Sequence, residues 1–63
     1  MNIPQQLRII RKEKKLSLRE VSEKTGISIS YIGEVERGDR RGNLEVIKKL
    51  LDYYNYKIYI KKL

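Results

Sequence analysis

The sequence predicts a small all-α domain of four short helices that ends in a single β-strand. Two observations indicate this fold class. Apolar residues recur every three or four positions through residues 3–54, in blocks that serine, glycine and asparagine separate. Residues 56–61 instead alternate between two faces and carry β-branched and aromatic side chains. A chain of 63 residues has enough apolar side chains for one thin core, so we expect a single compact domain.

The first helix is expected from Pro4 to about Lys15. Proline suits the first turn of a helix, where its missing N–H leaves no hydrogen bond unmade. Ile3, Leu7 and Ile10 recur at helical spacing and define one apolar face. Basic side chains crowd the remaining surface, so we expect an amphipathic, strongly positive helix that packs on the core through a narrow stripe.

The second helix is expected to begin directly after Ser17. Ser17 and Glu20 have the spacing of a capping box, in which the hydroxyl accepts from the Glu20 N–H and the carboxylate accepts from the Ser17 N–H. Leu18 and Val21 form the apolar pair of this helix. Gly26 ends it, because glycine adopts the left-handed backbone that often follows a helix. Two turns are too few for a stable isolated helix, so this one must dock against its neighbours.

The third helix follows almost at once, with Ser28 as its N-cap and Gly38 at its end. Ile32 and Val35 are expected to point into the core. Only two residues separate the end of the second helix from this cap, so the two helices must meet at a steep angle.

The fourth helix is expected to begin after Asn43, a favoured N-cap residue. Glu45 lies in its first turn, where a negative charge favours the positive end of the helix dipole. The expected apolar face consists of Leu44, Ile47, Leu50, Leu51 and Tyr54.

The expected strand has no partner elsewhere in the chain. Tyr56, Ile58 and Ile60 lie on one face and lysines flank them on the other. Pairing with the same strand of a second copy would satisfy its backbone and add apolar contacts that so short a chain lacks. We therefore expect a homodimer whose interface includes Tyr54, Tyr56, Ile58, Tyr59 and Ile60.

The composition limits the possible functions. The chain carries 15 Lys and Arg against 8 Asp and Glu, a net charge of +7, which favours a polyanionic partner. It has no histidine and no cysteine, so the usual general base, thiol chemistry and the commonest metal ligands are absent. We expect no enzyme, no cofactor, no metal and no small-molecule ligand. No apolar run is long enough to cross a membrane and no export signal is evident, so we expect a cytoplasmic protein with no membrane partner.

Several short motifs lie at fixed mutual spacing between Leu7 and Leu51. They are Ile10-Arg11, Leu16-Ser17, Gly26-Ile27-Ser28, Ser30-Tyr31-Ile32, Glu36-Arg37-Gly38 and Asn43-Leu44. Together they resemble the Cro/cI-type, or XRE-type, helix-turn-helix DNA-binding domain of bacterial and phage regulators. The resemblance implies a lambda-repressor-like fold for residues 1–55. Residues 56–63 then form a separate strand and basic tail for dimerisation.

The resemblance also implies which residues meet DNA. The third helix would lie in the major groove, and the second would cross the backbone above it. The base-contacting residues would be Ile29, Ser30, Gly33 and Glu34. The phosphate-contacting residues would be Ser17, Tyr31, Arg37, Arg40, Arg41 and Asn43. A structural ion pair would join Arg11 of the first helix to Glu36 of the third.

Two positions depart from the family pattern. Leu18 and Ile29 stand where the family usually has glutamine, or arginine at the second position. The usual bidentate base readers are therefore absent. Ile29 suits thymine methyl groups, and Ser30 can bond to several bases, so we expect a reader that tolerates A·T pairs and has weak intrinsic specificity. Glu34 could accept a hydrogen bond from cytosine or simply repel phosphate.

Two functions remain open from the sequence. The first is a sequence-specific transcriptional regulator, a dimeric repressor that occupies an inverted-repeat operator in double-stranded DNA. The second is a protein-interaction module, an antitoxin or anti-regulator whose main partner is a toxin or another regulator. The weak base readers keep the second hypothesis open.

Overall fold

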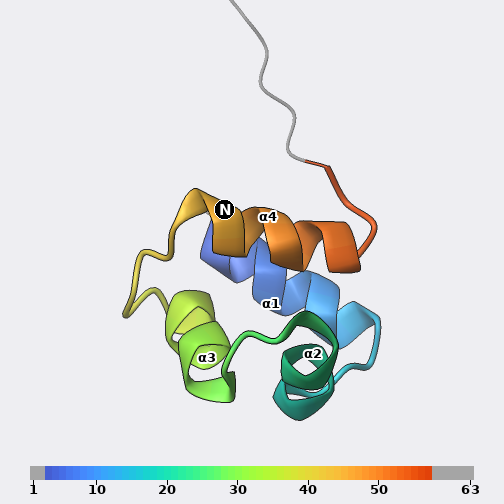
Figure 1. Cartoon of the computed structure of the whole chain (residues 1–63). Helices are drawn as coiled ribbons and strands as arrows, with labels where there is room; N and C mark the ends of the chain where they lie inside the picture. Colours follow the sequence, from blue (N-terminus) through green and yellow to red (C-terminus); the bar gives the residue numbers. More distant parts are fainter. Residues whose placement is uncertain (1–2, 58–63) are drawn as a thin grey trace, which may run out of the picture.

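The computed structural model describes residues 3–57. Its four helices are α1 (Ile3–Glu13), α2 (Leu18–Thr25), α3 (Ile29–Arg37) and α4 (Leu44–Tyr53). Figure 1 shows α2 and α3 together on one side of the molecule, with α1 and α4 across the other. α3 packs against both α1 and α2, and α4 packs against α2. The predicted all-α core is confirmed, while no strand is found within residues 3–57.

The helix ends follow the local chemistry predicted for them. The side chains of Ser17, Ser28 and Asn43 each accept a hydrogen bond from the backbone N–H three residues later, at 2.9–3.1 Å. The reciprocal half of the capping box at Ser17 is also present. Gly26 and Gly38 close α2 and α3 with φ angles of 77° and 81°, in the left-handed region where side chains are disfavoured. All three predicted N-caps and both glycine stops are therefore confirmed.

The core lies where the four helices meet. All four helices and the residue that follows α4 contribute to it. The fully buried apolar side chains are Leu7, Val21, Ile32, Val35, Leu50 and Tyr54. Eight partly buried hydrophobic residues pack around them. Because this small core draws on every helix, each helix depends on the others for its stability.

Three details of the predicted helices are corrected. α1 ends at Glu13, and Lys15 has a φ angle of 58°, so the chain leaves the helix before the predicted end. Leu44 was expected on the buried face of α4, yet it is 68% exposed, because it stands in the first turn, directly after the N-cap. Ile3, expected on the packed face of α1, is 44% exposed at the start of that helix.

The structure also changes the interpretation of the predicted dimer element. Tyr54 is buried in the core of its own chain, with 1% of its surface exposed, so it has no surface left for a second copy. Tyr56 is exposed and, like Lys57, is not part of a strand. Ile58, Tyr59 and Ile60 lie outside the described residues.

Candidate nucleic-acid interface

The pair α2–α3 presents one side of α3 to the outside of the molecule. The connection through Gly26, Ile27 and Ser28 is short, and Ile27 packs against the core. α3 turns Ile32, Val35 and Glu36 inward, where all three are buried. Its outward-facing residues at the N-terminal end are Ile29, which is 42% exposed, and Ser30. An exposed helix start next to a shorter supporting helix is the arrangement that can enter a major groove.

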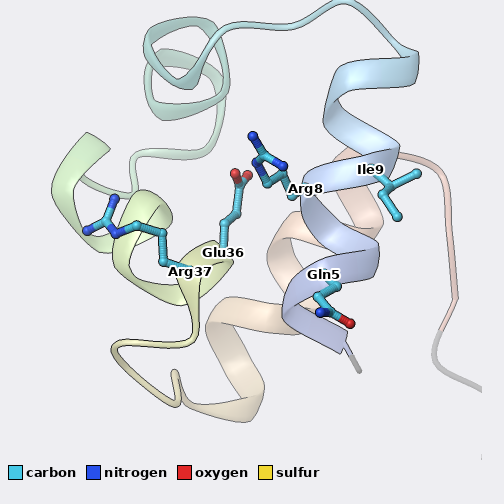
Figure 2. A pocket seen from close by; sticks show the side chains of 5 residues that line it. All are labelled: Gln5, Arg8, Ile9, Glu36 and Arg37. Atoms are coloured by element: carbon cyan, nitrogen blue, oxygen red, sulfur yellow. The ribbon is translucent and has the colours of Figure 1, made fainter. Parts of the chain in front are cut away.

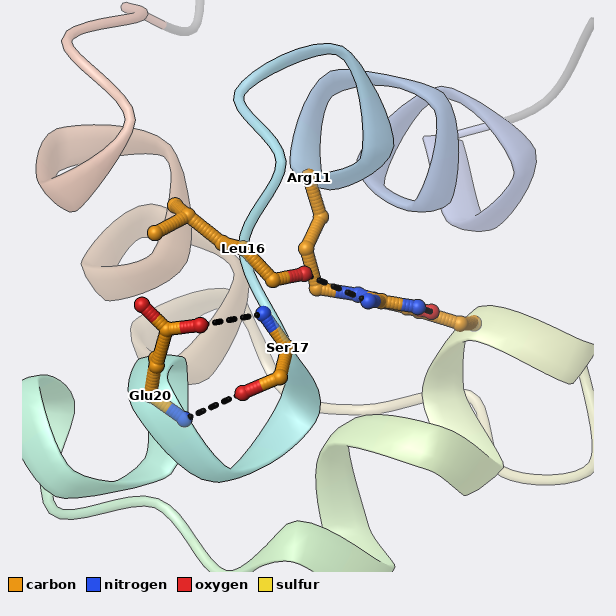
Figure 3. A network of polar contacts seen from close by, with 5 residues as sticks. Arg11, Leu16, Ser17 and Glu20 are labelled. Carbon is orange, nitrogen blue, oxygen red and sulfur yellow. Dashed lines mark hydrogen bonds and ion pairs between the residues drawn. The ribbon is translucent and has the colours of Figure 1, made fainter.

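A buried ion pair fixes the opposite side of α3. The Arg11 Nε–H donates to Glu36 Oε2 at 2.8 Å, and Nη2–H donates to Oε1 at 2.9 Å, so the two groups meet in a bidentate fork. The Nη1–H donates to the carbonyl oxygen of Leu16 at 2.8 Å. Figure 3 shows Arg11 extending from α1 toward α3 with this carbonyl beside its guanidinium. The structure therefore places the predicted pair between the two helices it was expected to join.

This pair is well shielded from water. The side chains of Arg11 and Glu36 are 10% and 4% exposed. The hydrogen bonds that Arg11 donates to Glu36 raise the pKa of Arg11 above its usual value, and burial opposes that shift. Its geometry gives the pair a structural role, because both charged groups are almost fully buried and are bonded to each other.

Gly33 is one of the four residues predicted to contact base edges. It is buried, because Leu18 of α2 and the side chain of Arg37 cover it. A Cβ at this position would lie 3.8 Å from Leu18 Cδ1 and only 3.1 Å from Arg37 Nη1. The glycine therefore allows Arg37 to lie along the helix, one turn back from its own backbone.

The end of α3 and the loop after it carry three arginines, and two of them already have acidic partners. The Arg37 Nε–H donates to Asp39 Oδ2 at 2.9 Å, and the Arg40 Nε–H donates to Glu34 Oε2 at 2.7 Å. Both pairs are exposed to solvent. Arg41 is exposed and forms no ion pair within residues 3–57. The five charged groups together leave one net positive charge at this edge.

These two surface ion pairs were missed by sequence reasoning. Asp39 could have been noticed, because it is two residues from Arg37. Glu34 and Arg40 are six residues apart, a spacing that brings no side chains together along a helix. They meet because the chain reverses at Gly38, where the N–H groups of Asp39 and Arg40 both donate to the Glu34 carbonyl at 2.9 and 3.2 Å.

The other predicted phosphate contacts lie around the same edge. Tyr31 is partly buried, and the Arg40 guanidinium carbon lies 5.0 Å from the centre of its ring. Ser17 and Asn43 are exposed, but their side-chain oxygens are already engaged in capping helices. An anion at these two positions would instead meet the first-turn N–H groups of α2 and α4 that the caps do not use.

The model of the helix-turn-helix family HTH_3 matches residues 7–60 of this chain. The chain belongs to the XRE-type helix-turn-helix family. This is a family of DNA-binding transcription regulators that are generally not enzymes. Searches among curated proteins and among solved structures found no significant match.

An open hollow lies between α1 and α3, away from the outer face of α3. Gln5, Arg8 and Ile9 of α1 line it together with Glu36 and Arg37 of α3. Figure 2 shows Arg37 pointing away from α1 at the rim of this hollow. Glu36 is committed to Arg11, so the hollow has no unpaired acidic group to offer a ligand.

The described residues contain neither a metal site nor a transmembrane helix. No group of three or more acidic side chains gathers within residues 3–57, and the chain has no histidine or cysteine. None of the four helices is long and apolar enough to span a bilayer.

Proposed function

We propose that this helix-turn-helix protein is a sequence-specific repressor that inserts α3 into the major groove of double-stranded DNA. The observation that carries the proposal is the arrangement of α3. Its inner side is locked to α1 by the buried pair of Arg11 and Glu36, while Ile29 and Ser30 stand exposed at its N-terminal end. A rigidly held helix with a free leading end can present the same side chains to successive base pairs.

The base contacts in this proposal come from Ile29 and Ser30. Ile29 offers an apolar surface to thymine methyl groups, and the Ser30 hydroxyl can donate to or accept from a base edge. Neither gives the bidentate recognition by which arginine or glutamine selects a particular base. The operator should therefore be rich in A·T pairs at the positions that α3 reads.

The phosphate contacts surround this helix on two sides. On one side are the N-terminus of α2 at Ser17 and the basic side chains of α1. On the other is the edge that begins at Tyr31 and continues through the loop to the N-terminus of α4, formed by Arg37, Arg40, Arg41 and Asn43. Such contacts would fix the orientation of α3 in the groove without reading sequence.

We also propose that two copies act together. The alternating pattern of residues 56–60 supports a strand that pairs with a second copy, with exposed Tyr56 at the start of the interface. Two recognition helices would then meet successive major grooves, about 34 Å apart, on an inverted repeat. Repression would follow from occupying the operator.

Selection of bound sites from random duplex DNA tests this proposal. The expected result is an inverted repeat whose half-sites are rich in A·T pairs. Binding to the selected duplex should weaken steeply and linearly in log affinity against log salt, because phosphate contacts release counterions. Failure to enrich any sequence, together with no duplex binding at low salt, would contradict the proposal and favour the protein-interaction alternative.

Removal of residues 56–63 tests the proposed dimer separately. The truncated chain keeps every buried side chain of the core, from Leu7 to Tyr54, so it should fold. Sedimentation should then show a monomer that binds the inverted repeat weakly. A truncated chain that still sediments as a dimer would place the interface elsewhere.

A further inference from the structure

Glu34 is an unexpected residue on a helix that enters DNA. A carboxylate at the outer side of α3 should repel phosphate, or it should read a cytosine directly. The structure shows a different arrangement, because Glu34 Oε2 accepts from the Arg40 Nε–H at 2.7 Å. The side chains of Glu34 and Arg40 are 33% and 54% exposed, so the pair lies at the surface.

The backbone brings these two residues together before their side chains meet. Gly38 reverses the chain with a φ angle of 81°. The Asp39 and Arg40 N–H groups can then both donate to the Glu34 carbonyl oxygen. Residue 40 is therefore held beside residue 34 by main-chain hydrogen bonds, and the carboxylate only has to orient the arginine side chain.

The guanidinium of Arg40 is constrained on two sides. Glu34 holds its Nε–H, and the ring of Tyr31 lies 5.0 Å from its central carbon, within the range of a cation–π contact. A guanidinium carries five N–H donors, and the four on its terminal nitrogens have no partner within residues 3–57. The hydrogen bond that Arg40 donates to Glu34 raises the pKa of Arg40 above its usual value. The group is thus permanently charged, oriented, and open to an anion.

We propose that Glu34 is a positioning residue that holds Arg40 over Tyr31 with its terminal N–H groups presented to a DNA phosphate. This inference rests on the proposed function, because it assigns a role within the same DNA-binding surface. It makes Glu34 an acidic residue that strengthens binding to a polyanion. An unrestrained arginine would have to give up side-chain freedom when it met the phosphate, and the Glu34 contact removes part of that cost beforehand.

The proposal and the two simpler roles of Glu34 predict different signs for the change in DNA affinity when Glu34 is removed. If Glu34 only repels phosphate, removal of its charge raises DNA affinity whatever stands at position 40. If Glu34 reads a base by itself, its removal lowers affinity whatever stands at position 40. Only a residue that acts through Arg40 changes the sign of its effect when Arg40 is absent.

A double-mutant cycle separates these outcomes. Affinity for a short duplex that carries the selected inverted repeat is measured by fluorescence anisotropy near 0.1 M salt, for wild type, Glu34→Ala, Arg40→Ala and the double variant. Glu34→Ala alone should weaken binding about three- to tenfold, as expected when one charge-assisted contact is impaired. In the Arg40→Ala background, the same substitution should strengthen binding about two- to threefold, because only repulsion remains.

Glu23→Ala is the matched control. Glu23 is an exposed glutamate of α2 with no ion pair within residues 3–57, so its removal makes the same change in net charge. It should leave affinity unchanged or raise it slightly. Thermal unfolding of each variant confirms that the fold is retained.

An effect of Glu34→Ala with the same sign in both backgrounds would overturn the proposal. A rise in both would show simple repulsion, and a fall in both would show a direct contact by Glu34. Failure of the proposed function itself has a different signature, since wild type would then bind no duplex in the first measurement of the cycle.

Discussion

Two glutamates of α3 stand two residues apart, and each is paired with an arginine on a different side of the helix. Glu36 meets Arg11 in a bidentate fork whose side chains are at most 10% exposed. Glu34 accepts a single hydrogen bond from Arg40, at a surface where the arginine is 54% exposed. The same two residue types therefore serve different purposes, because burial determines whether a charge can be reached from outside.

The comparison separates the stability of the domain from its function. The inner pair, Arg11 and Glu36, holds α1 against α3, and its charged groups are bonded within the domain. The outer pair, Glu34 and Arg40, adds little to stability, because water competes for the charged groups of an exposed ion pair. It lies instead on the side that we propose to meet DNA. Substitutions at the two glutamates should therefore affect different measurements.

The largest expected effect is the loss of stability when the inner pair is broken. Glu36→Ala leaves the Arg11 guanidinium buried without its partner, which should lower the free energy of unfolding by about 3–5 kcal/mol. In a chain of this size, that is a large part of the total stability. Urea or thermal unfolding measures the loss, with Glu34→Ala as the matched control on the same helix. DNA affinity per folded molecule should stay the same, and an unchanged Tm for Glu36→Ala would remove the structural role of the inner pair.

Tyr54 is buried in the same core as Glu36 and Arg11, and it makes the stability of the domain depend on pH. Burial, and then the negative charge of Glu36, raise the pKa of Tyr54 to about 12, while Arg11 opposes the shift. The folded chain holds this proton more tightly than the unfolded chain, whose tyrosine has a pKa near 10. The resulting stability is fully present below about pH 10 and is lost as the pH rises toward 12, by about 2–3 kcal/mol.

Tyr54→Phe is the variant that isolates this effect. Unfolding free energies of wild type and Tyr54→Phe, compared from pH 9 to 12, should diverge as wild type weakens further. At neutral pH the variant should be at least as stable as wild type, because the buried hydroxyl has no hydrogen-bond partner within residues 3–57. A parallel decline of the two proteins above pH 10 would show that Tyr54 is not shielded as the structure indicates.

The smallest expected effect on stability follows when the outer pair is broken. Arg40→Ala should leave Tm within about 2 °C of the wild-type value, since the Glu34–Arg40 pair is exposed. Its affinity for duplex DNA should nevertheless fall, and the slope of log affinity against log salt should become shallower by about one unit for each lost phosphate contact. A Tm loss as large as that of Glu36→Ala would erase the distinction between the two pairs.

Local chemistry made much of the fold predictable. Ser17, Ser28 and Asn43 cap their helices through N–H groups only three residues away, so the sequence alone contains both partners. The inner pair of Arg11 and Glu36 joins residues 25 positions apart. Its prediction came from the family resemblance, because no spacing rule links residues so distant in sequence.

The rest depended on tertiary packing. Tyr54 continues the apolar face of α4, but its place in the core depends on how α4 lies on the other helices. Gly33 is covered by Arg37, four residues along the same helix, and by Leu18 of α2, which the helical pattern could not place there. The Glu34–Arg40 pair required the backbone reversal after α3 in three dimensions. These tertiary contacts therefore changed the interpretation of the site more than that of the fold.

Backbone amide NMR during titration with duplex DNA tests the central claim most directly. If the outer side of α3 enters the groove, the signals of Ser17, Ile29–Glu34 and Arg40–Asn43 should move together as DNA is added. Amides on the outer side of α4, such as those of Lys48 and Asp52, should remain in place. Shifts confined to α4, or to the hollow between Ile9 and Arg37, would contradict the account, because DNA would then contact a different face of the domain.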